Sequence, residues 1–408
     1  METCHSLEKM MSGPLSGVTI LDISTVVAGP LATMHLADQG ANVIKVEPPG
    51  GDINRRSRQK VSENGQFSAL FISTNHGKRS IALDLKNAEA MAAFRKLLLK
   101  ADVLVQNFRP GTTEKLGIGW EDVRKINPRT IYVSITGVGD DGPYVRKRIY
   151  DPMIQALSGM ADIQSEQTTR RPQMIRTILA DKTTSIFAAQ AITAALFARE
   201  KTGLGQHIRL SLLGTMLSFL WPEAMMQYTV VGRESTAAAT NVGPDLVFET
   251  RDGFMTVGTI SDAEWKGFCD AVERPELKED ERFATAEFRN LNSTERINIM
   301  AAILREGERD EWLRRLDRAD VPCAPVLRRN EIIDNEQVRA MHLVQTLEQP
   351  FVGEVRQPSP AARFDDTPSA IRGPAPGIGQ HTRDILSEVG LSDAQIEGLI
   401  TSGAARAG

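Results

Sequence analysis

Asp181 is a carboxylate whose place in the sequence could serve either structure or chemistry. It follows the apolar residues 178–180 (ILA) and precedes a run of mostly small residues over 183–198, which leads into charges and a Gly-rich turn. The pattern predicts an extended segment that delivers Asp181 as the N-cap of a helix, since Asp favours that position and alanine favours helices. Such a carboxylate can simply cap the helix, or it can be kept ionised by the helix and attack a carbonyl carbon. Position alone leaves both roles open.

Hydrogen-bond donors gather in a second stretch, directly after a predicted strand at 102–105. Asn107, Arg109 and Lys115 lie there within nine residues. Ligands of an open α/β sheet bind at the carboxyl ends of its strands, and cationic donors suit a phosphate group. The alternative is a solvated loop in which the arginine forms only a salt bridge.

Other segments carry weaker signals. Residues 137–144 (GVGDDGPY) form a Gly-rich connection that a ligand could approach closely, but no GK[ST] sequence follows. Residues 77–85 (GKRSIALDL) predict an exposed basic turn that leads into a half-buried strand. The six histidines are scattered, so no metal site is predicted, and no GxSxG nucleophile motif occurs.

Alternating strand and helix patterns must position these residues. Strands are predicted over 18–22, 41–47, 101–105, 130–134 and 207–213, with helices that open near Gly29 and span 87–100. This order predicts an α/β fold with an open, mostly parallel sheet. A nicotinamide cofactor is disfavoured although Glu47 ends the second strand, because the first turn, 24–30 (STVVAGP), has one glycine rather than three.

The pattern changes after residue 213. A β-hairpin is predicted over 246–260 around Asp252 and Gly253, followed by helices over 263–272, 293–306 and 309–319. We predict that residues 1–220 form the N-terminal part of a large domain and 221–330 a smaller α+β domain. Residues 331–408 would supply a linker, Pro-rich over 349–376, and two helices that return to the large domain.

Composition excludes several classes of partner. The net charge of the 408 residues is −4 and charges of both signs are interspersed, so neither nucleic acid nor an anionic membrane surface is an expected partner. Cys4, Cys269 and Cys323 predict no disulfide framework and no zinc site, which fits a cytoplasmic protein. No run reaches the roughly 20 apolar residues of a membrane span, and residues 1–13 lack the apolar core of a signal peptide.

Taken together, the motifs resemble the class III CoA-transferase family (CaiB/BaiF type), which includes formyl-CoA transferase-like and α-methylacyl-CoA racemase-like enzymes. The resemblance extends from about residue 14 to 399. The residues that carry it are 28–30 (AGP), 40–48 (GANVIKVEP), 77–80 (GKRS), 83–86 (LDLK), 107–111 (NFRPG), 137–143 (GVGDDGP), 150–151 (YD), Asp181, 201–206 (KTGLGQ), 321–325 (VPCAP) and 379–382 (GQHT).

The resemblance implies a CoA-thioester enzyme without a prosthetic group, with coenzyme A or acyl-CoA as substrate. It implies a homodimer of interlocked chains, each with a Rossmann-like large domain built from both chain ends and a small middle domain. It assigns the catalytic role to Asp181 and places Tyr150 beside the thioester. The further CoA contacts that it implies are Val27, Ala28, Leu83, Lys86, Asn107, Phe108, Arg109 and Lys115.

Departures from the family pattern indicate which reaction and which substrate acid to expect. Racemase-like members carry a His-Asp pair where this chain has Tyr150 and Asp151, which favours transfer over racemisation. Pro48 replaces an arginine of the formyl-CoA type, and residues 237–245 hold one glycine where that type has a glycine-rich loop. A different small acid, such as another dicarboxylate, is therefore expected as much as formate or oxalate.

We predict a CoA-transferase that moves CoA between an acyl-CoA and a free carboxylic acid, through an aspartyl anhydride and an aspartyl-CoA thioester on Asp181. One alternative is a racemase or an intramolecular CoA-transferase of the same fold. The other is a non-catalytic acyl-CoA-binding protein in which Asp181 is only a helix cap.

Overall fold

The computed structural model describes residues 13–57, 60–166, 169–233 and 245–408. The lead-in at 1–12 and nearly all of the segment 237–245 lie outside the described residues. The chain forms two compact units, the first comprising the described residues up to Thr229 together with His342–Gly408, and the second Val230–Met341. Among the described helices, none combines the length and the apolar character that a membrane crossing requires.

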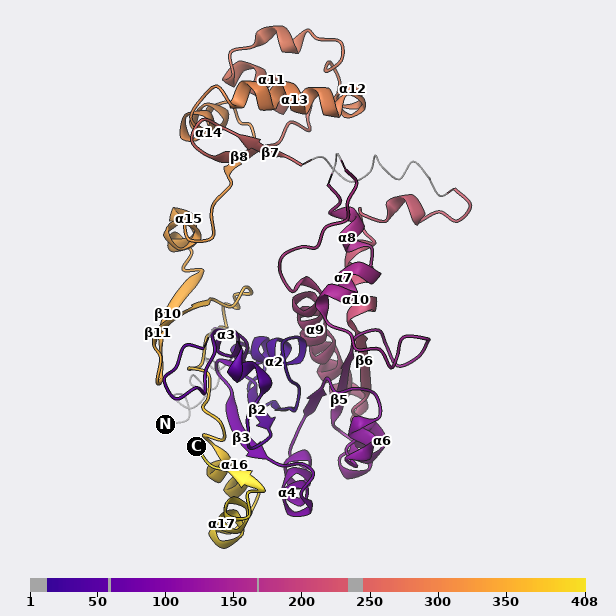
Figure 1. The fold of residues 1–408 in the computed structure, drawn as a ribbon, viewed down its shortest axis with the longest axis vertical. Helices are drawn as coiled ribbons and strands as arrows, with labels where there is room; N and C mark the ends of the chain where they lie inside the picture. The colour runs from indigo at the N-terminus through magenta and orange to yellow at the C-terminus, as the bar shows by residue number, and fades with distance from the viewer. Residues whose placement is uncertain (1–12, 58–59, 167–168, 234–244) are drawn as a thin grey trace. The chain divides into compact units, whose positions relative to one another are not determined.

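The first unit is built on a seven-stranded sheet (Figure 1) with the order β12-β3-β2-β1-β4-β5-β6. All neighbouring strands are parallel except β12, which is antiparallel to β3. The expected open, mostly parallel sheet is therefore confirmed. The strands are β1 (Thr19–Asp22), β2 (Asn42–Glu47), β3 (Arg79–Leu83), β4 (Val103–Gln106), β5 (Ile131–Thr136), β6 (His207–Ser211) and β12 (Ala405–Arg406).

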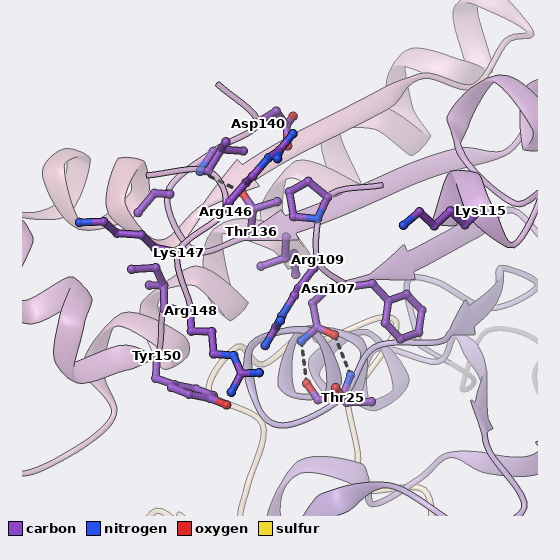
Figure 2. Close-up of a pocket in the computed structure, with 18 residues that line it drawn as sticks. Thr25, Asn107, Arg109, Lys115, Thr136, Asp140, Arg146, Lys147, Arg148 and Tyr150 are labelled. Carbon is purple, nitrogen blue, oxygen red and sulfur yellow. Dashed lines mark hydrogen bonds between the residues drawn. The ribbon is translucent and has the colours of Figure 1, made fainter. Parts of the chain in front are cut away.

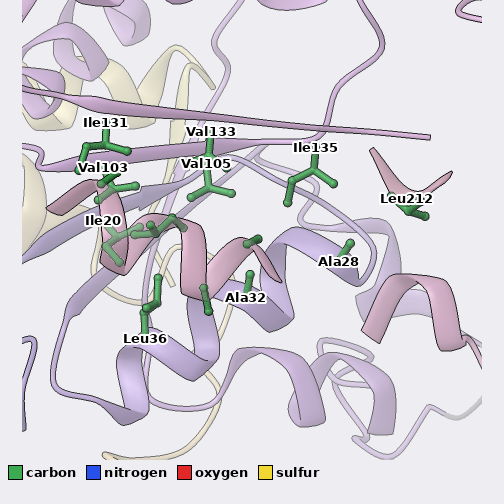
Figure 3. Close-up of a cluster of buried hydrophobic side chains, with 14 of the residues drawn as sticks. Ile20, Ala28, Ala32, Leu36, Val103, Val105, Ile131, Val133, Ile135 and Leu212 are labelled. Carbon is green, nitrogen blue, oxygen red and sulfur yellow. The ribbon is translucent and has the colours of Figure 1, made fainter. Parts of the chain in front are cut away.

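Two apolar clusters cover the two faces of this sheet because alternate strand residues point to opposite sides. On one face, Ile20, Val105 and Val133 pack against α2 (Ala28–Asp38) and α9 (Leu179–Thr202), as Figure 3 shows for α2. On the other face, Leu21 and Leu104 pack with helices α4 (Ala88–Leu98), α6 (Trp120–Ile126), α16 (Thr382–Glu388) and α17 (Asp393–Thr401). The central strands are buried on both sides.

The strand order reverses between β1 and β4, where the chain passes to β2 and β3 on one side and to β5 and β6 on the other. Such a reversal opens a crevice at the carboxyl ends of the strands. The residue that follows β1 is joined to β4 there, because the Ile23 amide donates to the Val105 carbonyl at 3.0 Å. The loops after β1, β4 and β5 are therefore placed to form a binding site.

A network of buried charges lies beneath the turn after β1. Lys78 pairs with Asp22 at 2.9 Å, Lys45 with Asp52 at 2.9 Å, and Arg55 with Glu47 at 2.6 Å. These six side chains are between 0% and 2% exposed. Buried charges of this kind persist only when they are paired and hydrogen-bonded.

The prediction of an exposed basic turn at 77–80 is wrong for Lys78. Its ammonium donates to the Asp22 carboxylate, the Pro30 carbonyl and the Asn75 side chain, so all three of its hydrogens are satisfied inside the fold. Burial would raise the pKa of Asp22, but the charges of Lys78 and Lys45 outweigh it and lower that pKa to about 2. Glu47 is likewise engaged, by Arg55.

The second unit contains the predicted hairpin, formed by β7 (Val247–Glu249) and β8 (Phe254–Val257). A third strand, β9 (Cys323–Pro325), which the sequence patterns did not predict, pairs with β8. Trp265, Phe268 and Phe283 are central in its core. Its helices are α11 (Asp262–Ala271), α12 (Ala286–Leu291), α13 (Ser293–Leu304) and α14 (Arg309–Arg318), with the 3-10 turns η3 (Pro275–Lys278) and η4 (Ile332–Asp334) and the short helix α15 (Glu336–Ala340).

Three further details differ from the sequence patterns. The strand expected over 207–213 stops at Ser211, where α10 (Leu212–Leu220) begins, because the Ser211 hydroxyl caps that helix. The Pro-rich stretch contains β11 (Gly353–Pro358), which pairs with β10 (Val344–Gln349). Two residues near the C-terminus form β12. The remaining elements of the first unit are η1 (Ile53–Arg56), α3 (Ala69–Asn75), α5 (Thr112–Lys115), α7 (Asp151–Leu157), α8 (Met160–Ile163) and η2 (Met226–Tyr228).

Candidate active site

A cavity of about 840 Å³ lies at the carboxyl ends of β4 and β5 (Figure 2). Its walls come from Thr25 after β1, from the loop after β4, from residues 135–140 and from residues 145–150. The structure thus brings together five residues of the predicted binding set, namely Asn107, Phe108, Arg109, Lys115 and Tyr150.

Positive charge dominates the lining of this cavity. Arg109, Lys115 and three consecutive cations at 146–148 line it, together with the acid Asp140. Asp140 is itself neutralised by Arg209 of β6 at 3.3 Å. Figure 2 shows that Arg109 and Arg148 point toward the same part of the cavity, near Tyr150. This arrangement favours a ligand with several negative charges, such as phosphate groups.

Arg146, Lys147 and Arg148 were not among the predicted binding residues. The sequence contained a usable signal, because these three cations follow the Gly-rich connection that leaves a strand of the sheet. The glycines alone were a weak indication of a ligand site, and the cations alone could have formed a solvated surface. Their combination at a strand's carboxyl end was the more specific feature.

Both polar atoms of the Asn107 side chain bond to the backbone of Thr25. Its amide oxygen accepts from the Thr25 amide at 2.8 Å, and its amide nitrogen donates to the Thr25 carbonyl at 2.6 Å. Phe108 is held through its own backbone amide, which donates to Gln106 at 2.8 Å. Arg109 and Lys115 are exposed and remain available to a ligand. Asn107 therefore ties the turn after β1 to the loop after β4.

That turn carries a strained residue. Val26 has φ = 70°, in the left-handed region that a β-branched side chain rarely adopts. The Asn54 side chain donates to the Val26 carbonyl, and Asn107 holds the neighbouring Thr25. Strain of this kind persists only where its surroundings impose it, and it clusters at functional sites.

The other four residues implied as CoA contacts lie outside the cavity lining. Val27 precedes α2 and Ala28 is its first residue, and each is 3% exposed. Leu83 ends β3 and is also buried, whereas Lys86 is exposed shortly after it. Their contacts with CoA remain predictions.

Asp181 is half-buried and is the third residue of α9, which begins at Leu179. The prediction that Asp181 is the N-cap is therefore wrong. The N-cap is Ile178, which has no side-chain acceptor. Instead, Asp151 accepts hydrogen bonds from the amides of Ala180 and Asp181, at 2.7 and 3.2 Å. A partner 30 residues away was not visible in the local pattern.

The pKa of Asp181 also differs from what a helix-capping position would give. Burial, and after it the negative charge of Asp151, raise the pKa of Asp181 to about 6, whereas capping geometry would have lowered it. Asp181 is still mostly ionised at neutral pH. It does not line the cavity, but Tyr150 does, and Tyr150 is followed directly by Asp151, which holds the Asp181 backbone.

No metal site was found, since no cluster of three His, Cys, Asp or Glu side chains suited to an ion occurs in the described part of the chain.

The strand order, with its crevice between β1 and β4 and the cation-lined cavity beside it, defines a Rossmann-like α/β protein. Comparison with known proteins identifies its family. The sequence profile of CoA-transferase family III matches residues 15–382. The chain belongs to CoA-transferase family III, and as such it is an enzyme.

Relatives and solved structures agree with this assignment. Succinyl-CoA:glutarate CoA-transferase of Mus musculus is 35% identical over 396 residues, which are 96% of this chain and 90% of that protein. Succinyl-CoA:mesaconate CoA-transferase of Haloarcula hispanica is 34% identical over 391 residues, 93% of this chain and 97% of that protein. The crystal structure of a CaiB/BaiF family protein from Brucella suis superposes with a TM-score of 0.81 at 31% identity, covering 93% of this chain and all of that one.

Proposed function

We propose that this enzyme transfers CoA from an acyl-CoA thioester to a free carboxylic acid, with Asp181 as the nucleophile. The observation that carries the proposal is the state of the Asp181 carboxylate. It is half-buried, its pKa is raised to about 6, and no hydrogen bond from the described residues engages its oxygens. A carboxylate that is ionised at neutral pH and yet unpaired is suited to attack a carbonyl carbon.

The reaction proceeds in four balanced steps. An Asp181 oxygen attacks the thioester carbonyl, the C–S bond breaks, and CoA leaves as a thiolate, so that an acyl-aspartyl anhydride remains. The thiolate attacks the aspartyl carbonyl and releases the donor acid as a carboxylate. The acceptor carboxylate attacks this aspartyl-CoA thioester, which forms a second anhydride and frees the thiolate. The thiolate then attacks the acceptor's carbonyl, and Asp181 is regenerated.

Each protein group has a distinct part in this scheme. Arg109, Lys115 and the cations at 146–148 bind the phosphates of CoA, and Tyr150 stands beside the thioester. Val27, Ala28, Leu83 and Lys86 provide further contacts to CoA. Because both anhydride and thioester hydrolyse, the site must exclude water while it holds the thiolate and the acceptor together.

Dicarboxylic acids are the substrates that we propose. The names of the mouse and Haloarcula relatives pair succinyl-CoA with glutarate and with mesaconate. Succinyl-CoA is therefore the first donor to test, with C4 and C5 dicarboxylates as acceptors.

The deciding experiment measures acyl-CoA products by mass spectrometry after incubation with succinyl-CoA and a panel of acids. We expect transfer with the wild type and a loss of at least about 1,000-fold in Asp181→Asn, since the nucleophile is gone. Hydroxylamine added after the acyl-CoA should trap a hydroxamate on Asp181. A matched control is Asp162→Asn, which removes an exposed acid of α8.

Two results would overturn the proposal. One is full CoA exchange by Asp181→Asn. The other is uptake of α-deuterium from heavy water into a 2-methylacyl-CoA without any acceptor acid, which would indicate a racemase.

A further inference from the structure

Asp151 is a buried acid that is hydrogen-bonded to the start of α9 and to Gln155 of its own helix. It is 2% exposed and is the first residue of α7. One of its oxygens, Oδ2, accepts from the amides of Ala180 and Asp181 at 2.7 and 3.2 Å. The other, Oδ1, accepts from the Gln155 side chain at 2.6 Å. Both carboxylate oxygens are therefore committed.

Gln155 extends this contact to the segment that leads into α9. Its amide nitrogen also donates to the carbonyls of Ile175 and Thr177, at 3.3 and 3.0 Å. Its amide oxygen accepts from the Ile175 amide at 2.9 Å. Asp151 and Gln155, one helical turn apart on α7, thus fix the backbone from 175 to 181.

The contact has a chemical consequence for Asp181. Amides at a helix start stabilise a carboxylate and lower its pKa, which makes it a weaker nucleophile. Here Asp151 occupies the amides of Ala180 and Asp181, and it adds a second negative charge nearby. The Asp181 carboxylate is consequently left without these stabilising bonds.

We propose that Asp151 is the positioning residue of the nucleophile: it fixes the Asp181 backbone and, by taking the helix amides itself, keeps the Asp181 carboxylate reactive. This inference rests on the proposed nucleophilic role of Asp181. Asp151 touches no substrate in this scheme and acts only through Asp181.

Other charges near α9 do not explain the behaviour of Asp181. Five elements pack against α9, and α10 carries no titratable or charged group. The titratable and charged groups on the other four are His35 and Asp38 of α2, Asp151 of α7, Tyr132 of β5, and His207 and Arg209 of β6. The flanking cations are Arg176 and Lys182, and the Lys182 ammonium donates to the Thr177 hydroxyl at 2.8 Å. Among all of these, Asp151 is the group whose charge raises the pKa of Asp181.

The test compares pH profiles of kcat/KM for CoA transfer in the wild type and in Asp151→Asn. We expect the acidic limb of the wild type near pH 6, and a limb lower by less than about one unit in the variant, because removing the charge of Asp151 leaves burial, the larger cause of the raised pKa, in place. At pH 8, kcat should fall about 10- to 100-fold with the KM for acyl-CoA nearly unchanged, because Asp181 is displaced. Asp151→Glu, which restores the charge, should bring the limb back near pH 6.

The variant Gln155→Met separates the effect of backbone position at 175–181 from the effect of the Asp151 charge. It loosens the backbone at 175–181 but leaves Asp151 charged, so we expect kcat to fall about tenfold while the acidic limb stays near pH 6. This variant also carries the test if Asp151→Asn does not fold. Asp162→Asn is the control, because it removes an exposed acid of α8 whose carboxylate forms no hydrogen bond to α9 within the described residues.

The inference fails if kcat and the pH profile of Asp151→Asn match the wild type, or if Gln155→Met keeps full kcat. Those outcomes would leave the nucleophilic role of Asp181 intact. By contrast, exchange activity in Asp181→Asn would remove the proposed function itself.

Discussion

Asp181 and Asp151 share one helix start but have opposite surroundings. Asp151 is fully buried and hydrogen-bonded through both oxygens, whereas Asp181 is half-buried and its carboxylate has no partner among the described residues. Ionising Asp181 therefore costs free energy that the fold does not recover locally. Catalytic groups often carry such a cost, because reactivity and stability make opposite demands on them.

Replacing Asp181 should stabilise the protein. The pKa of Asp181 is about 6 in the fold and near 3.8 when unfolded, so ionisation penalises the folded state increasingly from about pH 4 and fully above pH 6. We expect Asp181→Asn to raise the free energy of unfolding by about 1–2 kcal/mol at pH 8, less than the full shift implies because water screens a half-buried group. The gain should vanish below pH 4. Urea unfolding at pH 4 and pH 8 measures it, and an equal gain at both pH values would contradict the electrostatic cause.

At the scale of elements, the ends of strands determine where the site forms. Strands at 18–22, 41–47 and 130–134 and the hairpin around Asp252 were predictable, because apolar alternation and turn residues are local signals. The cluster at Asn107 and Arg109 was predictable for the same reason, since it directly follows a strand. The partners of Lys78 and Asp181 were not, because Asp22 and Asp151 lie 56 and 30 residues away in the chain.

Short strands were missed for a different reason. β9 has three residues, including a proline, and β12 has two, which is too few for an alternating pattern. Both pair because a longer neighbour, β8 or β3, presents an open edge. Such pairing is a property of the assembled sheet rather than of the segment.

The buried pair of Lys78 and Asp22 should be important for stability. Lys78→Met leaves Asp22 buried without its partner, and we expect a loss of about 3–5 kcal/mol in the free energy of unfolding. The control is Arg383→Met, which removes an exposed ion pair with Glu397 and should leave the urea midpoint close to that of the wild type. Equal losses in the two variants would show that burial of the pair is not what matters.

The cations of the cavity should govern the affinity for CoA. We expect Arg109→Ala and Arg148→Ala each to raise the KM for acyl-CoA about tenfold with little change in kcat, because both line the cavity and we propose that they bind phosphates rather than the reacting carbonyl. The increase in KM should be smaller at high salt, because salt screens the contacts between these arginines and the phosphates in the wild type as well. Lys125→Ala, an exposed cation of α6 outside the cavity, is the control. A fall in kcat at unchanged KM would place these arginines at the chemistry instead.

At the scale of the whole molecule, large apolar side chains are exposed on neighbouring helices of the first unit. Ile186 and Phe197 of α9 are 61% and 65% exposed, and Phe219 of α10 is 48% exposed. The two helices pack against each other. Apolar side chains that form a contiguous exposed patch mark an interface. We propose that a second copy of the chain covers them, in agreement with the dimer that the family resemblance implies.

Light scattering during size exclusion tests the dimer. We expect a mass twice that of the 44.8 kDa chain. The interlocking that the family resemblance implies would keep this mass unchanged on dilution, because interlocked chains cannot separate without unfolding. Phe197→Asp should lower the yield of folded protein rather than produce a stable monomer. A mass of 44.8 kDa for the wild type would contradict the proposal.

The pairing of β12 with β3 also affects how the protein is made. The Ala82 amide of β3 donates to Thr382, 300 residues later, and β12 follows still further along the chain. At about 5–20 residues per second, the ribosome needs on the order of 15–60 s to synthesise the intervening stretch. During that time the β3 edge has unpaired amides and carbonyls, which can template aggregation. The nascent enzyme should therefore depend on chaperones until its last strand emerges.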